Sequence, residues 1–470
     1  MKHSDRSLGR VDLALASALL LGACATAPEL PRYQAELPRD FAHAPATASE
    51  PVAGFWRGFA DPDLDELMAQ AIVANADLRI AAANLQAARS LADVADAQAK
   101  PTLGATAGAA RVRSRNNDAS GDVSRTDNSV ALGLDAAWEL DLFGRIGNER
   151  RAAAANVGAS EALLRAAQVS VAAEVARNYF ELRGAQEQLR VTQSLLEGYR
   201  QGLKLVELRL EVGRGNAFDT ERARALVQTT VAAVPALEAA LARSRYRLAV
   251  LTGRPPTALD ARLAAPKPLP GLPATALAAI GSPENLLRRR PDVAAAEQQL
   301  VAAAAQVGVA RAALWPRITL GGTLGLNAAR VGDLGDASSF VYNLGASLVW
   351  SLLDGGRSRA QIAAASARGE AAVVQYEKTV LLALEETESA LATYTRNQQQ
   401  TDALFGAAQA AGKASQIARA RLDAGSIDFL AVLDTGREEL ATRDRLAQAQ
   451  TASATALVAV YKALAGGWTR

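Results

Sequence analysis

The octapeptide WELDLFGR at Trp138–Arg145 has a counterpart, WSLLDGGR at Trp350–Arg357, 212 residues further along the chain. The pentapeptides RLEVG at Arg209–Gly213 and RLDAG at Arg421–Gly425 repeat at the same spacing. Two more pairs repeat at 215 residues: Asp77-Leu78 with Asp292-Val293, and Pro101 with Pro316. Alanine-rich composition does not produce four ordered matches at nearly one spacing. The chain is therefore predicted to contain two copies of one structural unit.

The residues leading into each octapeptide alternate in polarity with a period of two. Even-numbered positions in 130–142 are apolar and odd-numbered ones are small or polar, and 340–352 follows the same pattern. One complete apolar face and one small, polar face are typical of a membrane barrel with lipid outside and water inside. Trp138 and Trp350 are then candidate aromatics of the membrane interface. The alternative is a pair of amphipathic hairpins on a soluble core.

Each unit is predicted to supply two strands, within about 102–142 and about 317–353, joined by polar loops at 113–128 and 330–339. Four strands cannot close a barrel that keeps an open lumen. Open sheet edges in lipid would leave backbone N–H and C=O groups unpaired. The chain is therefore predicted to oligomerise, and three copies would supply 12 strands.

Long helices are expected wherever proline is absent outside the strands. Segments 144–212 and 356–423 contain no proline and are rich in Ala, Leu, Glu, Arg and Gln, so each is predicted to be one helix of roughly 100 Å. Helices are also expected at 218–252 and 427–465, and before the strands at 64–98 and 283–314. Gly213 and Gly425 are predicted to turn each long helix back on its follower, because glycine accepts a left-handed conformation.

The N-terminus is predicted to be a targeting segment. Residues 1–23 combine basic residues with a short apolar run ending in Leu21-Gly22-Ala23-Cys24, which is similar to a bacterial lipobox. Lipidation of Cys24 by acyl chains such as palmitate would anchor the mature chain to a membrane leaflet; the alternative is an ordinary signal peptide with a chance cysteine. Residues 24–60, with five prolines, are expected to form an extended tether.

Composition argues against catalysis and against nucleic-acid binding. The 51 Lys and Arg nearly balance the 49 Asp and Glu, which leaves no basic surface for nucleic acid. With one Cys and two His in the chain, a Cys/His metal site and a His-based triad are nearly excluded. The glycine-rich stretches lack the Lys-Ser/Thr of a nucleotide loop. The chain is therefore expected to be no enzyme and to use no cofactor and no metal.

The assembled motifs resemble the outer-membrane factor family, the TolC/OprM-type exit ducts of bacterial efflux pumps. Besides the lipobox, the resemblance rests on stretches spread over the mature chain: Phe55–Leu64, Trp138–Arg145, Leu287–Val293, Val309–Pro316 and Tyr461–Trp468. It implies a trimeric 12-stranded outer-membrane β-barrel continuous with a long periplasmic α-helical barrel. The repeats would cover 61–260 and 283–470, with a proline-rich linker at 261–282. It also implies docking to a periplasmic adaptor and, through it, to an inner-membrane pump.

The resemblance also suggests where the entrance closes. Asp434 holds the position of the family's acidic ring, Leu430 that of its apolar constriction, and Arg437 that of a basic residue near the gate. Three Asp434 carboxylates on one axis would favour cations over anions and raise one another's pKa; the alternative is a solvated helix-face residue. The TolC-type latch residues are replaced by Ile427 and Leu422, so opening is expected to depend on apolar tip contacts and the adaptor.

The first tip, 213–219, is expected to contact the adaptor, or else to be only a flexible turn. The function predicted for the whole chain is passive export of small toxic compounds. The alternatives are a structural coiled-coil lipoprotein, and an outer-membrane outlet for secreted protein. Metal export is disfavoured, because Met68 and His43 are the only Met and His outside residues 1–23.

Overall fold

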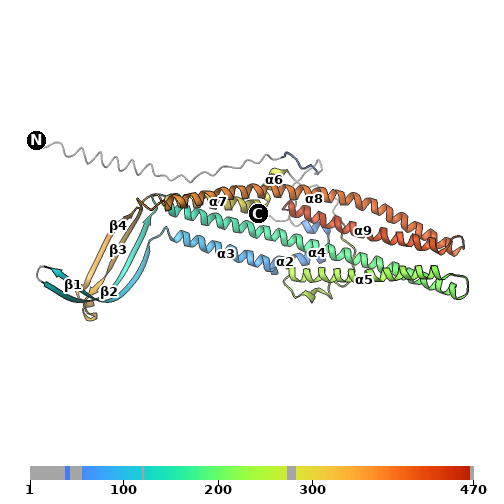
Figure 1. Cartoon of the computed structure of the whole chain (residues 1–470), viewed down its shortest axis with the longest axis horizontal. Coiled ribbons are helices and arrows are strands. Elements are labelled where there is room, and N and C mark those ends of the chain that lie inside the picture. Colours follow the sequence, from blue (N-terminus) through green and yellow to red (C-terminus); the bar gives the residue numbers. More distant parts are fainter. Residues whose placement is uncertain (1–37, 43–54, 119–120, 272–281, 466–470) are drawn as a thin grey trace. The chain divides into compact units, whose positions relative to one another are not determined.

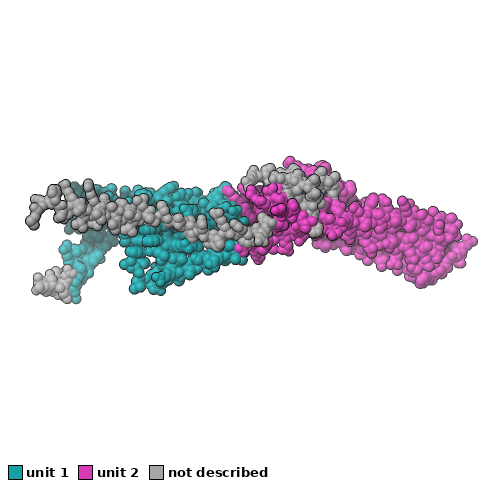
Figure 2. Space-filling view, turned by 90° about the horizontal axis from the view of Figure 1, so that it is seen from above, with its two compact units in different colours: residues 1–34, 85–160, 296–376 teal, residues 35–84, 161–295, 377–470 magenta. Residues whose placement is uncertain are grey.

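The structure is a computed structural model that describes residues 38–42, 55–118, 121–271 and 282–465 (Figure 1). Cys24, the 1–23 leader and the closing residues 466–470 lie outside these ranges. The chain divides into two compact units, coloured separately in Figure 2, and each draws on both sequence repeats. Among the described residues, one unit comprises 85–118, 121–160 and 296–376, and the other comprises 38–42, 55–84, 161–271, 282–295 and 377–465.

The first unit contains the four predicted strands in a single antiparallel sheet. The strands are β1 (Thr102–Asp118), β2 (Gly121–Leu140), β3 (Arg317–Ala328) and β4 (Phe340–Val349), in the order β1-β2-β3-β4 (Figure 1). The two repeats join where β2 pairs with β3, with Trp138 opposite Leu320 and Gly133 opposite Gly325. β1 and β4 are left as the free edges of the sheet, as the hydrogen-bonding argument for oligomerisation requires.

The prediction of a loop at 113–128 is wrong. β1 and β2 continue through it in register, from Arg113 opposite Thr126 to Asp118 opposite Gly121. The polar residues there follow no hydrophobic alternation, so hydropathy does not reveal that the ladder continues. The second loop was right: between β3 and β4 lie two short 3-10 turns, η3 (Val331–Gly335) and η4 (Ala337–Ser339).

The strands end earlier than expected, and an aspartate just after each strand caps the helix that follows. Asp141 accepts hydrogen bonds from the backbone N–H groups of Ile146 and Gly147, and Asp354 accepts from those of Gly356 and Ser358. These carboxylates satisfy the free donors of the first turns of α4 (Arg145–Glu211) and α8 (Arg357–Asp423). The aspartate of each octapeptide is thus a helix cap.

The long helices agree with the expectation from proline placement. α4 and α8 are each 67 residues, and their followers α5 (Ala217–Leu251) and α9 (Phe429–Ala463) are each 35. The turns lie at one end of the helical unit (Figure 1). Gly213 has φ +71° and Gly425 φ +70°, and the next N–H reaches back to the carbonyl of Arg209 or Arg421.

The helices before the strands are broken in two, whereas single helices were expected. The first copy has α2 (Pro62–Ala74) and α3 (Ala76–Ala97), and the second has α6 (Pro283–Arg289) and α7 (Pro291–Ala312). The residues at the breaks, Asn75 and Arg290, are extended, with ψ of 133° and 119°. Pro291 explains the second break, because a residue before proline is pushed out of the helical region.

At each break, a side chain bonds to the C-terminal end of one of the helices that follow the long helices, α5 or α9. The buried Asn75 donates from Nδ2 to the carbonyl of Leu251, the last residue of α5, at 3.0 Å. The buried Arg290 donates from Nη1 to the carbonyl of Ala463, the last residue of α9, at 2.8 Å. The two repeats therefore perform the same task with different side chains.

Part of the expected tether belongs to the folded core. Residues Phe55–Phe59 form a 3-10 turn, η1, in which Phe55, Trp56 and Phe59 are buried. Phe59 packs on Phe180 of α4 with ring centroids 4.7 Å apart, and Phe55 stacks on Tyr461 of α9 at the same distance. A second short turn, η2 (Pro256–Leu259), follows α5. The aromatic side chains outweigh the extended bias of the neighbouring prolines.

Candidate functional site

The predicted gate residues share one stripe near the start of α9. The helix begins at Phe429 after the cap residue Asp428, whose carboxylate accepts from the N–H of Ala431 at 3.0 Å. Leu430, Asp434 and Arg437 follow at spacings of four and three, which places them on one helix face. Leu430 is half-buried, whereas Asp434 and Arg437 are exposed.

The first repeat contributes a partner that the sequence reading missed. Arg222 of α5 donates from Nη2 to Oδ1 of Asp434 at 3.2 Å. Arg222 and Asp434 are 212 residues apart, so they occupy equivalent positions in the two repeats. Phe218 precedes Arg222 by one turn, as Leu430 precedes Asp434, and its ring lies 5.6 Å from the Arg222 guanidinium carbon. The repeat offset was the signal that could have revealed the pair.

Buried contacts join the two hairpins close to this ion pair. Tyr199 of α4 donates its hydroxyl to the carbonyl of Gly436 at 2.6 Å, and burial raises the pKa of Tyr199 to about 12. A Cβ at Gly436 would lie 3.1 Å from the Tyr199 ring, so this position favours glycine. An apolar cluster draws its buried members from four helices: Val206, Ala223, Leu422, Phe429 and Leu433.

The positions of the absent TolC-type latch belong to this apolar cluster. Leu422 is one of its buried members, and the partly buried Ile427 packs against it. The inter-hairpin connection in this chain is thus mainly apolar, with one exposed ion pair and one buried hydroxyl. Exposed ion pairs contribute little stability, so burial of the cluster dominates the energy that holds the hairpins together.

A groove of about 720 Å³ runs beside the gate residues, between α4, α5 and α9. Asp434, Arg437, Glu438 and Asp444 supply its charges, and threonines and aliphatic side chains supply most of the rest. Burial raises the pKa of Asp444, although Gln448 donates a hydrogen bond to it. This mixed lining is suited to a water-filled passage.

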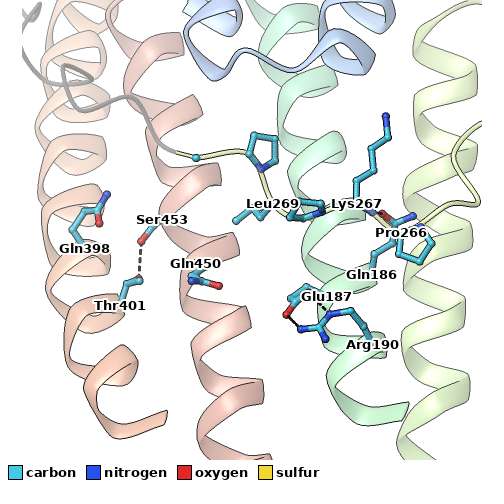
Figure 3. Close-up of a pocket in the computed structure, with 13 residues that line it drawn as sticks. Gln186, Glu187, Arg190, Pro266, Lys267, Leu269, Gln398, Thr401, Gln450 and Ser453 are labelled. Carbon is cyan, nitrogen blue, oxygen red and sulfur yellow. Dashed lines mark hydrogen bonds and ion pairs between the residues drawn. The ribbon is translucent and has the colours of Figure 1, made fainter. Parts of the chain in front are cut away.

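A second cavity, of about 610 Å³, lies beneath the linker residues 266–271 (Figure 3). Its charged groups are already paired, since Arg190 donates to Glu187 from both Nε and Nη2. The hydroxyls of Thr401 and Ser453 bond to each other at 3.0 Å across α8 and α9. Because these groups bond to one another, we assign no ligand to this cavity. Across the residues that the structure describes, no group of three or more His, Cys, Asp or Glu side chains could hold a metal ion.

The two candidate interface tryptophans occupy equivalent junctions in the strand-bearing unit. Trp138 donates its indole N–H to the carbonyl of Ala99, two residues after α3, at 3.0 Å. Trp350 donates to the carbonyl of Leu314, two residues after α7, also at 3.0 Å. Both rings remain partly exposed, at 39% and 49%. Each indole therefore fastens the end of a helix to a strand while presenting an apolar ring outward.

Comparison with known proteins agrees with this architecture. The family model for outer membrane efflux proteins matches residues 67–254 and again 282–466, one match per repeat. The pyoverdine export outer membrane protein OpmQ of Pseudomonas aeruginosa is 34% identical over 97% of both chains. Outer membrane protein OprJ of the same species is 33% identical over 97% of this chain and 95% of its own. The solved outer-membrane channel OprN is 37% identical, with a TM-score of 0.89, over 95% of this chain and all of its own.

The chain therefore belongs to the outer membrane efflux protein family. It is one protomer of a trimeric outer-membrane channel, in which three four-stranded sheets close a barrel of 12 strands. It works with a periplasmic adaptor and an inner-membrane pump, and it resides in the outer membrane with a long periplasmic helical part. The resemblance drawn from the sequence motifs is confirmed.

Proposed function

We propose that this chain is the passive exit duct for small toxic solutes, closed at its periplasmic entrance by Leu430, Asp434 and Arg437. The observation that carries the proposal is the position of these residues. They lie on one face near the start of α9, where Asp434 and Arg437 line a groove and the neighbouring Phe429 and Leu433 belong to the apolar cluster that joins both hairpins. The duct carries out no chemical step, and its energy comes from the pump.

The substrate class follows from the same features. The relative OpmQ is named for pyoverdine export, and a wet groove lined by threonines and aliphatic side chains suits solutes of mixed polarity. We propose that the adaptor and pump choose the solute and that the duct lets it pass. The first tip, with Arg214 and Phe218 exposed, is proposed to contact the adaptor.

Membrane attachment and domain division complete the proposal. Cys24 is proposed to carry the lipid anchor, the part of the 24–60 tether before Phe55 to connect it to the body of the protein, and 261–282 to link the repeats. Trp138 and Trp350 are proposed to lie at the membrane interface, where a partly exposed indole with a satisfied N–H is favoured. Gly213 and Gly425 are proposed to form the tips that face the adaptor.

Replacing Asp434 with alanine is expected to make the resting channel leak. The change removes the charge at the entrance and the partner of Arg222, while the cap at Asp428 and the buried cluster stay intact. Planar-bilayer recording should show a severalfold higher conductance, and cells producing the variant alone should take up more large antibiotics. Asp402→Ala is the matched control, because Asp402 is an exposed carboxylate on α8.

Three outcomes separate the hypotheses. A leak in Asp434→Ala with none in Asp402→Ala supports the gate. Trimers of Asp434→Ala that conduct as the unmodified protein does would remove Asp434 from the gate while leaving the duct. Trimers that conduct neither as the unmodified protein nor as Asp434→Ala would favour a structural lipoprotein instead.

A further inference from the structure

The entrance carries a feature that an acidic ring does not contain. The residue equivalent to Asp434 in the first repeat is Arg222, and the two side chains bond to each other at 3.2 Å. A trimer therefore brings three carboxylates to the entrance only together with three guanidinium groups. The internal duplication makes the two kinds of charge alternate around the axis, one from each hairpin.

We propose that Arg222 is a second gate residue and that the entrance is a charge-balanced ring of alternating Arg222 and Asp434, not an acidic one. The proposal rests on the proposed position of Asp434 at the entrance. Its consequence is a specificity that differs from that of an acidic ring: the pair of residues discriminates weakly between cations and anions. This corrects the cation preference expected from Asp434 alone.

The short distance between Arg222 and Asp434 explains why the pair discriminates weakly between cations and anions. Charges 3.2 Å apart act as a dipole on an ion beyond them, because their separation is well below the screening length of ~8 Å at physiological ionic strength. An isolated carboxylate would instead act as a full negative charge.

The positions of the two charges do not depend on the strength of the ion pair between them. The two side chains are 36% and 62% exposed, and such a pair adds little to stability. Selectivity depends on where the charges are fixed, and that is set by the helices that carry them. Tyr199–Gly436 and the apolar cluster hold these helices together independently of the pair.

Most neighbouring charges have other partners, and Arg437 and Glu438, which are opposite in sign, both lie further along α9 in the same groove, so Arg222 is the cation that the structure pairs with Asp434. Arg224, two residues on, donates to Glu221 at 2.6 Å and to Glu207 at 3.0 Å. On α9, the buried Glu439 is paired with Arg443 at 2.7 Å and Arg419 at 3.5 Å. Phe218 packs against Arg222, so the guanidinium has an apolar contact on its own helix as well.

The experiment is a reversal-potential measurement on purified trimers in planar bilayers under a KCl gradient. Arg222→Gln is expected to raise the potassium-to-chloride permeability ratio severalfold, because it exposes an acidic ring. Asp434→Asn is expected to lower the ratio by a similar factor. The double variant Arg222→Gln/Asp434→Asn and the exchange Arg222→Asp/Asp434→Arg are both expected to return to the ratio of the unmodified channel.

Arg224→Gln is the matched control, since it removes the same charge from the same helix two residues away. It is expected to leave the ratio nearly unchanged. If Arg222→Gln behaves like Arg224→Gln while Asp434→Asn shifts the ratio, the balanced ring is overturned and the acidic gate survives. If neither Arg222→Gln nor Asp434→Asn shifts the ratio, Asp434 does not face the permeating ions and the proposed gate fails as well.

Discussion

Replacing Arg290 with alanine should lower the free energy of unfolding by about 2–3 kcal/mol per protomer, because it removes a buried guanidinium that bonds to two partly exposed carboxylates and to a buried carbonyl. Arg290 is 7% exposed and binds three groups at once. Its guanidinium meets Asp292 through Nε at 3.0 Å and Nη2 at 2.8 Å, Glu386 of α8 at 2.6 Å, and the terminal carbonyl of α9. The variant would leave two carboxylates and one carbonyl without this donor.

Thermal unfolding in detergent, followed by helical circular dichroism, measures the loss. Arg288→Ala is the matched control, because Arg288 is 72% exposed and bonds only along its own helix, to Glu284. It should change stability by less than about 0.5 kcal/mol. If Arg290→Ala and Arg288→Ala have the same melting temperature, the bonds made by Arg290 do not hold the end of α9 in place.

The ion pairs of Arg290 with Asp292 and Glu386 also make the stability of the protein depend on pH. Burial alone would raise the pKa of Asp292 and of Glu386, but the bonds from Arg290 outweigh it and hold both below their ordinary values of 3.8 and 4.5. Carboxylates with lowered pKa stabilise the fold above those ordinary values, and the stabilisation disappears as the pH falls through the native pKa. Arg290→Ala should therefore lose part of this acid sensitivity, whereas Arg288→Ala should keep all of it.

Replacing Gly184 with alanine should also destabilise the protein strongly. A Cβ at Gly184 of α4 would lie 2.0 Å from Oγ1 and 2.9 Å from Cβ of Thr451 in α9. In an open helix the change gains about 1 kcal/mol. Here overpacking is expected to cost about 1–3 kcal/mol net, because a β-branched side chain bonded to the carbonyl of Ala447 cannot turn away. Thermal melting of the trimer measures the difference.

Two variants test the steric cause of this effect. Gly198→Ala, on the same helix, should be neutral or slightly stabilising, since a Cβ there meets no atom within 4 Å. Moving the glycine to the opposite helix, as Gly184→Ala/Thr451→Gly, should recover most of the lost stability. Equal melting temperatures for Gly184→Ala and Gly198→Ala would contradict close approach of α4 and α9.

The sequence predicted the elements whose patterns are long and regular. Alternation of period two located β2, β3 and β4, whereas the pattern of β1 is weaker because its apolar positions are mostly Ala and Gly. The absence of proline located α4 and α8 to within a residue or two of their ends. The repeat offset joined these elements into two equivalent halves. Such features are visible because many residues obey one rule, so that no single contact decides them.

The features that escaped prediction depend on single residues or on tertiary contact. No proline marks the helix break at Asn75 in the sequence. The break is stabilised by a hydrogen bond from Asn75 to the carbonyl of Leu251, which is far away in sequence. The extension of β1 and β2 beyond Arg113 follows a polar ladder that hydropathy does not reveal. Arg222 became part of the candidate gate only when α5 and α9 were seen together.

The most direct test of the account is the protein mass of the detergent-extracted particle, measured by light scattering during size-exclusion chromatography. A sheet with free edges at β1 and β4 requires sister subunits to complete its hydrogen bonds, so the expected mass is that of three chains. A particle of a single chain that remains dispersed after detergent removal would contradict the account, because its sheet would then need neither partners nor lipid.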